Sequence, residues 1–74
     1  MVKLTAKPCL SKILKQKGWT QLMLAEKTGL NQATISRFDR TTQRKDDHLF
    51  TIAYALGVKV EDLFEVTIEE EEKQ

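Results

Sequence analysis

The sequence has few of the residues that mark several common classes of protein. Its 74 residues include one cysteine, one proline, three glycines, three phenylalanines, one tryptophan and one tyrosine. A single cysteine, Cys9, excludes an intramolecular disulfide and the ligand spacing of a structural zinc site. We interpret Cys9 as a small hydrophobe, with a redox switch as the weaker alternative.

The absence of other sequence patterns excludes further classes of protein. No stretch approaches the roughly 18 consecutive apolar residues of a membrane-spanning helix, and no apolar signal segment follows Met1, so we expect a cytoplasmic protein with no membrane partner. His48 is the only histidine, and the sequence has neither a phosphate-binding glycine loop nor a nucleophile elbow. We therefore expect no enzyme, no cofactor and no metal.

The length favours one small domain spanning residues 1–74. At this size a single core barely offsets the conformational entropy of the chain, which favours a compact helical bundle or a dimer. We expect a helical core at about 8–64, an acidic tail at 65–74, and no small-molecule ligand domain.

The near-neutral net charge of +1 conceals a separation of charge along the chain. Residues 1–45 contain ten basic and two acidic residues, a net charge of +8, whereas residues 46–74 contain two basic and nine acidic residues, a net charge of −7. A basic segment of this kind favours a polyanionic partner.

Residues that begin and end helices divide the first half of the chain. Pro8 suits the first position of a helix that ends at Gly18. Thr20 is a natural N-cap for a second helix, which ends at Gly29, and Asn31 can cap a third. The apolar residues predicted to face the core in these helices are Leu10, Ile13, Leu14, Leu24, Ala25, Ile35 and Phe38.

The second half predicts two more helices. Asp46 or Asp47 can cap a fourth helix that ends at Gly57, and a fifth covers residues 61–64. The predicted core residues here are Leu49, Phe50, Ala53, Leu56, Leu63 and Phe64. The fold class is therefore all-α, with five short helices.

The two ends of the chain alternate apolar and polar residues. Val2 and Leu4 near the start, and Val66 and Ile68 near the end, recur with the period of a β-strand. Short terminal strands could pair within the chain and, through an exposed edge, join two subunits.

The second and third helices form a helix-turn-helix across Gly29 and Leu30. In this motif the second of the two helices enters the major groove of DNA. The outward residues of the helix predicted over Gln32 to Phe38 are Gln32, Ala33, Ser36 and Arg37. An ordinary solvated face is the alternative interpretation.

Two runs of the sequence resemble the Cro and phage-repressor family of helix-turn-helix regulators, also called the XRE family. They are WTQLMLAEKTGLNQATISRF from Trp19 to Phe38 and LFTIAYALGVKVEDLF from Leu49 to Phe64. The resemblance depends on the joint spacing of Gln21, Leu24, Ala25, Gly29, Ile35, Ala53, Leu56, Gly57 and Leu63. It implies a compact lambda-repressor-like domain that binds double-stranded operator DNA and regulates transcription, most often as a repressor.

The resemblance also implies which residues read bases. The family reads them from the positions of Gln32, Ala33, Ser36 and Arg37. Gln pairs bidentately with adenine, Arg pairs with guanine, and the Ala methyl contacts the methyl of thymine. Helix-turn-helix proteins commonly bind two half-sites, so we expect a homodimer on DNA in the nucleoid.

The resemblance and the basic residues together predict the phosphate contacts. In the family, Gln21 touches a phosphate and braces Gln32. The loop at 40–45 lacks the usual Asn-Gly turn of the family but contains three basic residues and two hydroxyls. The predicted phosphate-binding residues are Thr20, Gln21, Asn31, Arg40, Thr42, Arg44 and Lys45.

Some alternatives remain open at this stage. A protein-interaction module, antitoxin-like or an anti-repressor partner, could use the same scaffold. The run Glu69 to Glu72 could be a solvated end, a screen over the basic face or a contact for a partner. Trp19 and Phe38 are interpreted as aromatic residues of the core or its edge, and Lys59 replaces the usual Ser or Thr cap of the last helix.

Overall fold

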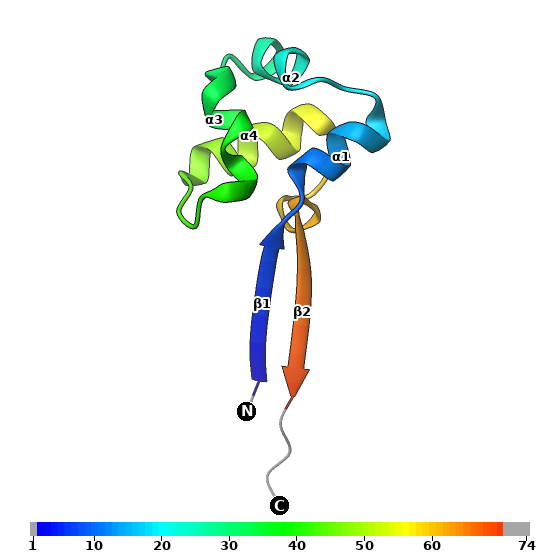
Figure 1. Cartoon of the computed structure of the whole chain (residues 1–74), viewed down its shortest axis with the longest axis vertical. Coiled ribbons are helices and arrows are strands. Elements are labelled where there is room, and N and C mark those ends of the chain that lie inside the picture. The colour runs from blue at the N-terminus through cyan, green and yellow to red at the C-terminus, as the bar shows by residue number, and fades with distance from the viewer. Residues whose placement is uncertain (1, 71–74) are drawn as a thin grey trace, which may run out of the picture.

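The computed structural model describes residues 2–70, which form a helical body and a two-stranded ribbon that projects from it (Figure 1). The molecule measures 53 × 23 × 18 Å along its principal axes, and the ribbon accounts for its length. In chain order the elements are β1 (Val2–Pro8), α1 (Leu10–Lys17), α2 (Gln21–Thr28), α3 (Gln32–Ser36), a 3-10 turn (Phe38–Arg40), α4 (Asp46–Leu56), a second 3-10 turn (Val60–Leu63) and β2 (Phe64–Glu70).

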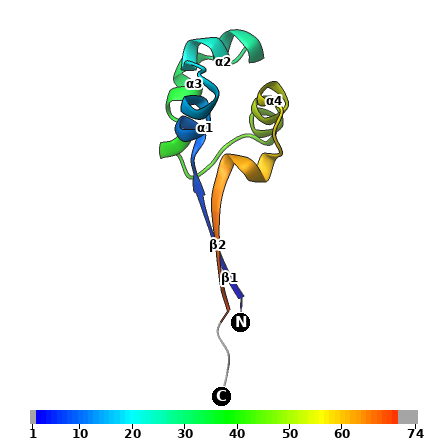
Figure 2. The same cartoon turned by 90° about the vertical axis from the view of Figure 1, so that its right-hand side faces the viewer.

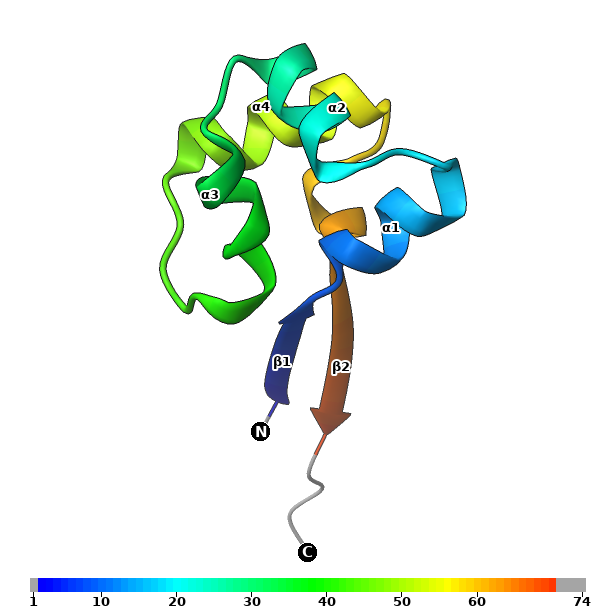
Figure 3. The ribbon, with the colours of Figure 1, turned by 45° about the horizontal axis from the view of Figure 1, so that its top comes forward.

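The predicted caps hold α2 and α3 in place. The Thr20 hydroxyl accepts a hydrogen bond from the Met23 N–H at 3.1 Å, and the Asn31 side-chain oxygen accepts one from the Ala33 N–H at 2.8 Å. Between the two helices, Gly29 has a φ of 75°, a conformation that costs glycine little because it lacks a Cβ. Figure 3 shows this turn from α2 into α3.

The start of α1 differs from the prediction. Pro8 is the last residue of β1, where it pairs with Phe64, and α1 begins only at Leu10. A proline is tolerated there because the ribbon has free edges that need no N–H donor. The cap comes instead from Asp39, whose carboxylate oxygens accept hydrogen bonds from the N–H groups of Leu10 at 2.9 Å and Ser11 at 3.0 Å.

The prediction of five helices is wrong for residues 2–70, where four α-helices are present. The predicted fifth helix is the 3-10 turn Val60–Leu63, which is too short to propagate α-helical hydrogen bonds. The helix predicted over Gln32 to Phe38 is also shorter, because the chain tightens into 3-10 geometry from Phe38. Such tightening at a helix end is a common way to satisfy its last carbonyls.

The core lies where α1, α2, α3 and α4 meet. Figure 2 shows α4 on one side of the body and α1 and α3 on the other, with the ribbon leaving from below. The prediction of Phe50 as a core residue is wrong, since it is 65% exposed, while Ile52 is fully buried. The buried apolar residues are Leu10, Ile13, Leu14, Leu24, Ala25, Ile35, Phe38, Ile52, Ala53, Leu56 and Leu63.

The predicted terminal strands are present and pair antiparallel. The register places Leu4 opposite Ile68 and Ala6 opposite Val66. Residues 65–70 of the predicted acidic tail therefore belong to β2, and the rest of the tail, including Glu71 and Glu72 of the glutamate run, lies outside the described residues. Within the described range, none of the helices has the length and apolar character needed to cross a membrane.

Candidate nucleic-acid interface

The outer face of α3 presents the four residues predicted to read bases. Gln32, Ala33, Ser36 and Arg37 are all exposed. The opposite side of the helix is anchored, because Ile35 is only 2% exposed within the core. A short helix held from one side in this way presents its polar side chains on a rigid support.

The start of α2 lies beside this face. Thr20 is exposed and uses its hydroxyl oxygen for the cap, which leaves the hydroxyl proton free to be donated. Gln21 is the first residue of α2 and is half-buried. The first N–H groups of an α-helix have no partners within the helix, so this end of α2 favours an anion.

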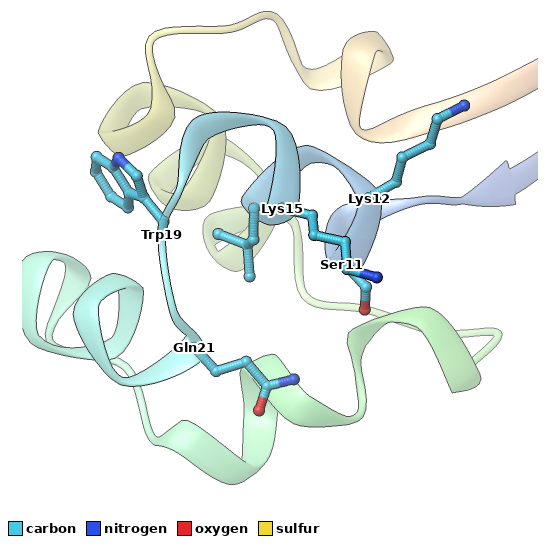
Figure 4. A pocket seen from close by; sticks show the side chains of 6 residues that line it. Ser11, Lys12, Lys15, Trp19 and Gln21 are labelled. Carbon is cyan, nitrogen blue, oxygen red and sulfur yellow. The ribbon is translucent and has the colours of Figure 1, made fainter.

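A hollow between α1 and the start of α2 brings further polar groups together. It encloses about 390 Å³. Figure 4 shows the Ser11, Lys15 and Gln21 side chains extending to the same side of the molecule, while Trp19 points the other way. The residues that line the hollow are Ser11, Lys12, Leu14, Lys15, Trp19 and Gln21.

Lys15 lines this hollow but is not among the residues that the sequence analysis selected. In sequence it is one of several lysines on the outer side of the first helix, and nothing distinguishes it from Lys12 or Lys17. Only the packing of α1 against the start of α2 places Lys15 on the hollow that Gln21 also lines.

Most of the remaining predicted phosphate-binding residues are exposed. Arg40, Thr42 and Lys45 lie at the surface of the loop that follows α3. Asn31 is also exposed, and its amide nitrogen takes no part in the cap formed by its oxygen. These four side chains remain available to a ligand.

Arg44 has a different environment from the other basic residues of the loop. Its Nε and Nη2 donate hydrogen bonds to the Phe38 carbonyl at 3.0 and 2.7 Å, and Nη2 also donates to the Thr41 carbonyl. The guanidinium carbon lies 4.7 Å from the centre of the Phe38 ring and 5.4 Å from that of Phe64. The group is therefore directed at the protein, and Nη1 alone is free of these bonds.

The Arg44 contacts connect the candidate interface to the ribbon. Phe38 follows α3, and Phe64 is the first residue of β2. Their ring centres lie 6.1 Å apart, and Arg44 stacks against both rings. One cation thus holds the end of α3, the loop and the base of the ribbon together.

The ribbon brings basic residues from the start of the chain opposite acidic residues from its end. Lys3 lies opposite Glu69 and Lys7 opposite Glu65, so the basic start of the chain is balanced by the acidic end. The basic residues that remain are carried by the helical body and its loop. This concentrates positive charge on the part of the molecule that contains α3.

Cys9 and the acidic residues among 2–70 are the candidates for a reactive or metal centre. Burial raises the pKa of the Cys9 thiol, and the nearby Glu65 and Asp39 carboxylates raise it further, which disfavours the reactive thiolate. Within residues 2–70, no three or more His, Cys, Asp or Glu side chains come together in a way that could hold a metal ion.

Comparison with known protein families gives a match over most of the chain. A family model described as the Cro/C1-type HTH DNA-binding domain matches residues 9–69. The match covers all four α-helices and most of β2, and it begins after β1. Searches of the curated proteins and of the solved structures found no match.

Proposed function

The chain belongs to the Cro/C1-type helix-turn-helix DNA-binding family, and from this premise we propose that it is a sequence-specific transcriptional repressor that inserts α3 into the DNA major groove. Family membership supports DNA binding and regulation of transcription. The observation that carries the specific proposal is the outer face of α3, on which four exposed side chains stand opposite a buried Ile35.

Gln32 and Arg37 are the main base-reading residues in this proposal. The amide of Gln32 is suited to pair with adenine and the guanidinium of Arg37 with guanine, because each forms two hydrogen bonds to one base edge. Ala33 and Ser36 lie on the same face and add a methyl contact and a hydroxyl. These side chains carry the sequence information.

The proposed phosphate contacts come from two groups of residues. We propose Lys15 and Gln21, which line the hollow between α1 and α2, together with the exposed Thr20, which caps α2. The other proposed contacts are Asn31, at the start of α3, and Arg40, Thr42 and Lys45, which follow its end, and all four are exposed. Arg44, with three donated hydrogen bonds inside the protein, acts mainly by positioning the loop.

We further propose that two copies bind adjacent half-sites. A helix of five residues contacts only a few base pairs, and two such helices one helical turn apart, about 34 Å, read a longer operator. We propose repression because a protein that occupies an operator can repress transcription without contacting any other protein.

The proposal is tested by selecting duplexes from a random pool at a stated salt concentration. We expect a conserved and approximately palindromic site, with Arg37→Ala losing about 1 to 3 kcal/mol on that site and relaxing the preference at one base. The matched control is Lys27→Ala, on the exposed surface of α2. Equal loss for Arg37→Ala on selected and random duplexes would contradict base reading.

Failure to enrich any duplex at moderate salt would contradict the proposed function as a whole. In that case capture of a discrete protein partner would favour the interaction-module interpretation.

A further inference from the structure

One face of the ribbon consists of apolar side chains that nothing in the described chain covers. Residues directly opposite each other in an antiparallel pair lie on the same face of the sheet. The register therefore places every second residue of β1 on the same face as every second residue of β2. We define the apolar ribbon face by its members Val2, Leu4, Ala6, Val66 and Ile68.

The exposure of this face is large for so small a protein. Leu4 is 62% exposed and Ile68 63%, and all residues of 2–7 and 65–70 are classed as exposed. Half of the eight exposed large hydrophobic residues among 2–70 lie here. An exposed cluster of this kind marks an interaction surface.

The ribbon also lacks support of its own. A two-stranded sheet in water is marginally stable at best, and gains stability when its apolar face is covered. No tight turn joins β1 to β2, because the whole helical body separates them in the chain. The ribbon extends away from that body, so the body does not cover its length (Figures 1 and 2).

The charges disfavour the edge-to-edge contacts that are centred on the middle residue of either strand. Pairing β2 with itself about a two-fold axis at Thr67 would set Glu65 of one copy opposite Glu69 of the other. Pairing β1 with itself about Thr5 would likewise set Lys3 opposite Lys7. Like charges directly opposite each other destabilise a sheet, so an edge contact centred on Thr67 or on Thr5 is disfavoured.

The same register leaves the apolar face free of this repulsion. The Lys3–Glu69 and Lys7–Glu65 pairs both lie on the other face, together with Thr5 and Thr67. This side of the ribbon contains no lysine, and its one acidic residue, Glu70, pairs with Val2 at the tip. Charge is therefore segregated to the face that water can solvate.

We propose that the apolar ribbon face packs against the same face of a second copy of this chain. Two such faces form a two-layered arrangement of four strands, with the layers about 10 Å apart. A two-fold contact uses the same patch twice, and this patch is uncharged and of the same size in both copies. The inference identifies the interface of the dimer in the proposed function and rests on that proposal for its role on DNA.

The size of the ribbon sets the strength of the contact. Seven residues per strand span about 23 Å, so the face has an outline on the order of 250 Å². A standard interface buries about 800 Å² per partner, so the dimer is expected to dissociate on dilution. Binding to two adjacent half-sites shifts that equilibrium toward the dimer.

The test compares two substitutions one residue apart on the same strand. Leu4→Lys places a charge on the apolar ribbon face, and Thr5→Lys places the same charge on the opposite face. Sedimentation equilibrium of the full chain over a range of concentrations is expected to show a dimer for the wild type. We expect the dissociation constant to rise at least tenfold for Leu4→Lys and to change less than twofold for Thr5→Lys.

A second variant separates loss of the contact from loss of the ribbon. Ile68→Thr removes apolar atoms but keeps a β-branched residue that favours a strand, and we expect it to weaken the dimer as well. A wild type that stays monomeric at all concentrations, or equal dimerisation of Leu4→Lys and Thr5→Lys, would overturn the proposal. The first of these results would assign the face to a different occupant.

Binding to a duplex with one half-site distinguishes this inference from the proposed function. The helical body is unchanged in Leu4→Lys, so we expect wild-type affinity for a single half-site and reduced affinity for a double site. If neither the wild type nor any variant bound DNA, the proposed function would be refuted. The proposed dimer interface would still be tested by the sedimentation experiment.

Discussion

The guanidinium of Arg44 donates two hydrogen bonds to the carbonyl oxygen of Phe38 and lies over the ring of the same residue. This contact fixes the loop after α3 against the end of that helix. The loop that it holds is the one that lacks the Asn-Gly turn expected from the family resemblance.

The first prediction concerns Arg44. Arg44→Ala is expected to lower the free energy of unfolding by about 1.5 to 3 kcal/mol, because it removes charge-assisted hydrogen bonds and leaves the Phe38 carbonyl without them. Arg44→Lys keeps the charge but not the fork of donors, so its loss should be smaller. Urea unfolding followed by circular dichroism measures both. A stable Arg44→Ala whose salt slope for DNA falls by about one would instead identify a phosphate ligand.

The second prediction concerns the cap of α1. Asp39→Ala is expected to cost about 1 to 2 kcal/mol of stability, since the N–H groups of Leu10 and Ser11 lose their acceptor. Asp47→Asn is a suitable control, because Asp47 is exposed in the first turn of α4 and contributes through the helix dipole alone, a few tenths of a kcal/mol. Equal unfolding midpoints for the two variants would contradict a capping role for Asp39.

The third prediction concerns Lys15. Lys15→Ala should weaken binding to specific and random duplexes by the same factor and lower the salt slope by about one, because a phosphate contact carries no sequence information. Lys59→Ala, beside α4 and away from the hollow that contains Lys15, should leave the slope unchanged. A loss confined to one base sequence would show that Lys15 has some other role.

The fourth prediction separates two neighbouring apolar residues of α4. Ile52→Ala is expected to cost about 2 to 5 kcal/mol, because the side chain is fully buried and its loss leaves a cavity. Phe50→Ala should change stability by less than about 0.5 kcal/mol, since most of that ring is already in water. Urea midpoints of the two variants give the comparison, and a larger cost for Phe50→Ala would contradict the observed orientation of α4.

Local patterns predicted much of the fold and of the site. The caps at Thr20 and Asn31 and the turn at Gly29 are confirmed, because each depends on residues within a few positions of one another. The exposure of Gln32 and Arg37 also follows from helical spacing. In α4, by contrast, helical periodicity allowed more than one set of apolar residues to face the core. The packing of α4 against α2 and the second 3-10 turn determines that the set containing Ile52 is buried.

The sequence by itself determined the order of α1 to α4, the capping residues of α2 and α3, which side of α3 faces outward, and that the two ends of the chain can form strands. Only the tertiary structure decided that Asp39 caps α1, that Arg44 turns toward Phe38 and Phe64, and that the register gathers the apolar residues of both strands on one face. The physical reason is range. Caps and helical periodicity act between neighbours in the chain, whereas these three contacts join segments whose relative positions exist only after the core has packed.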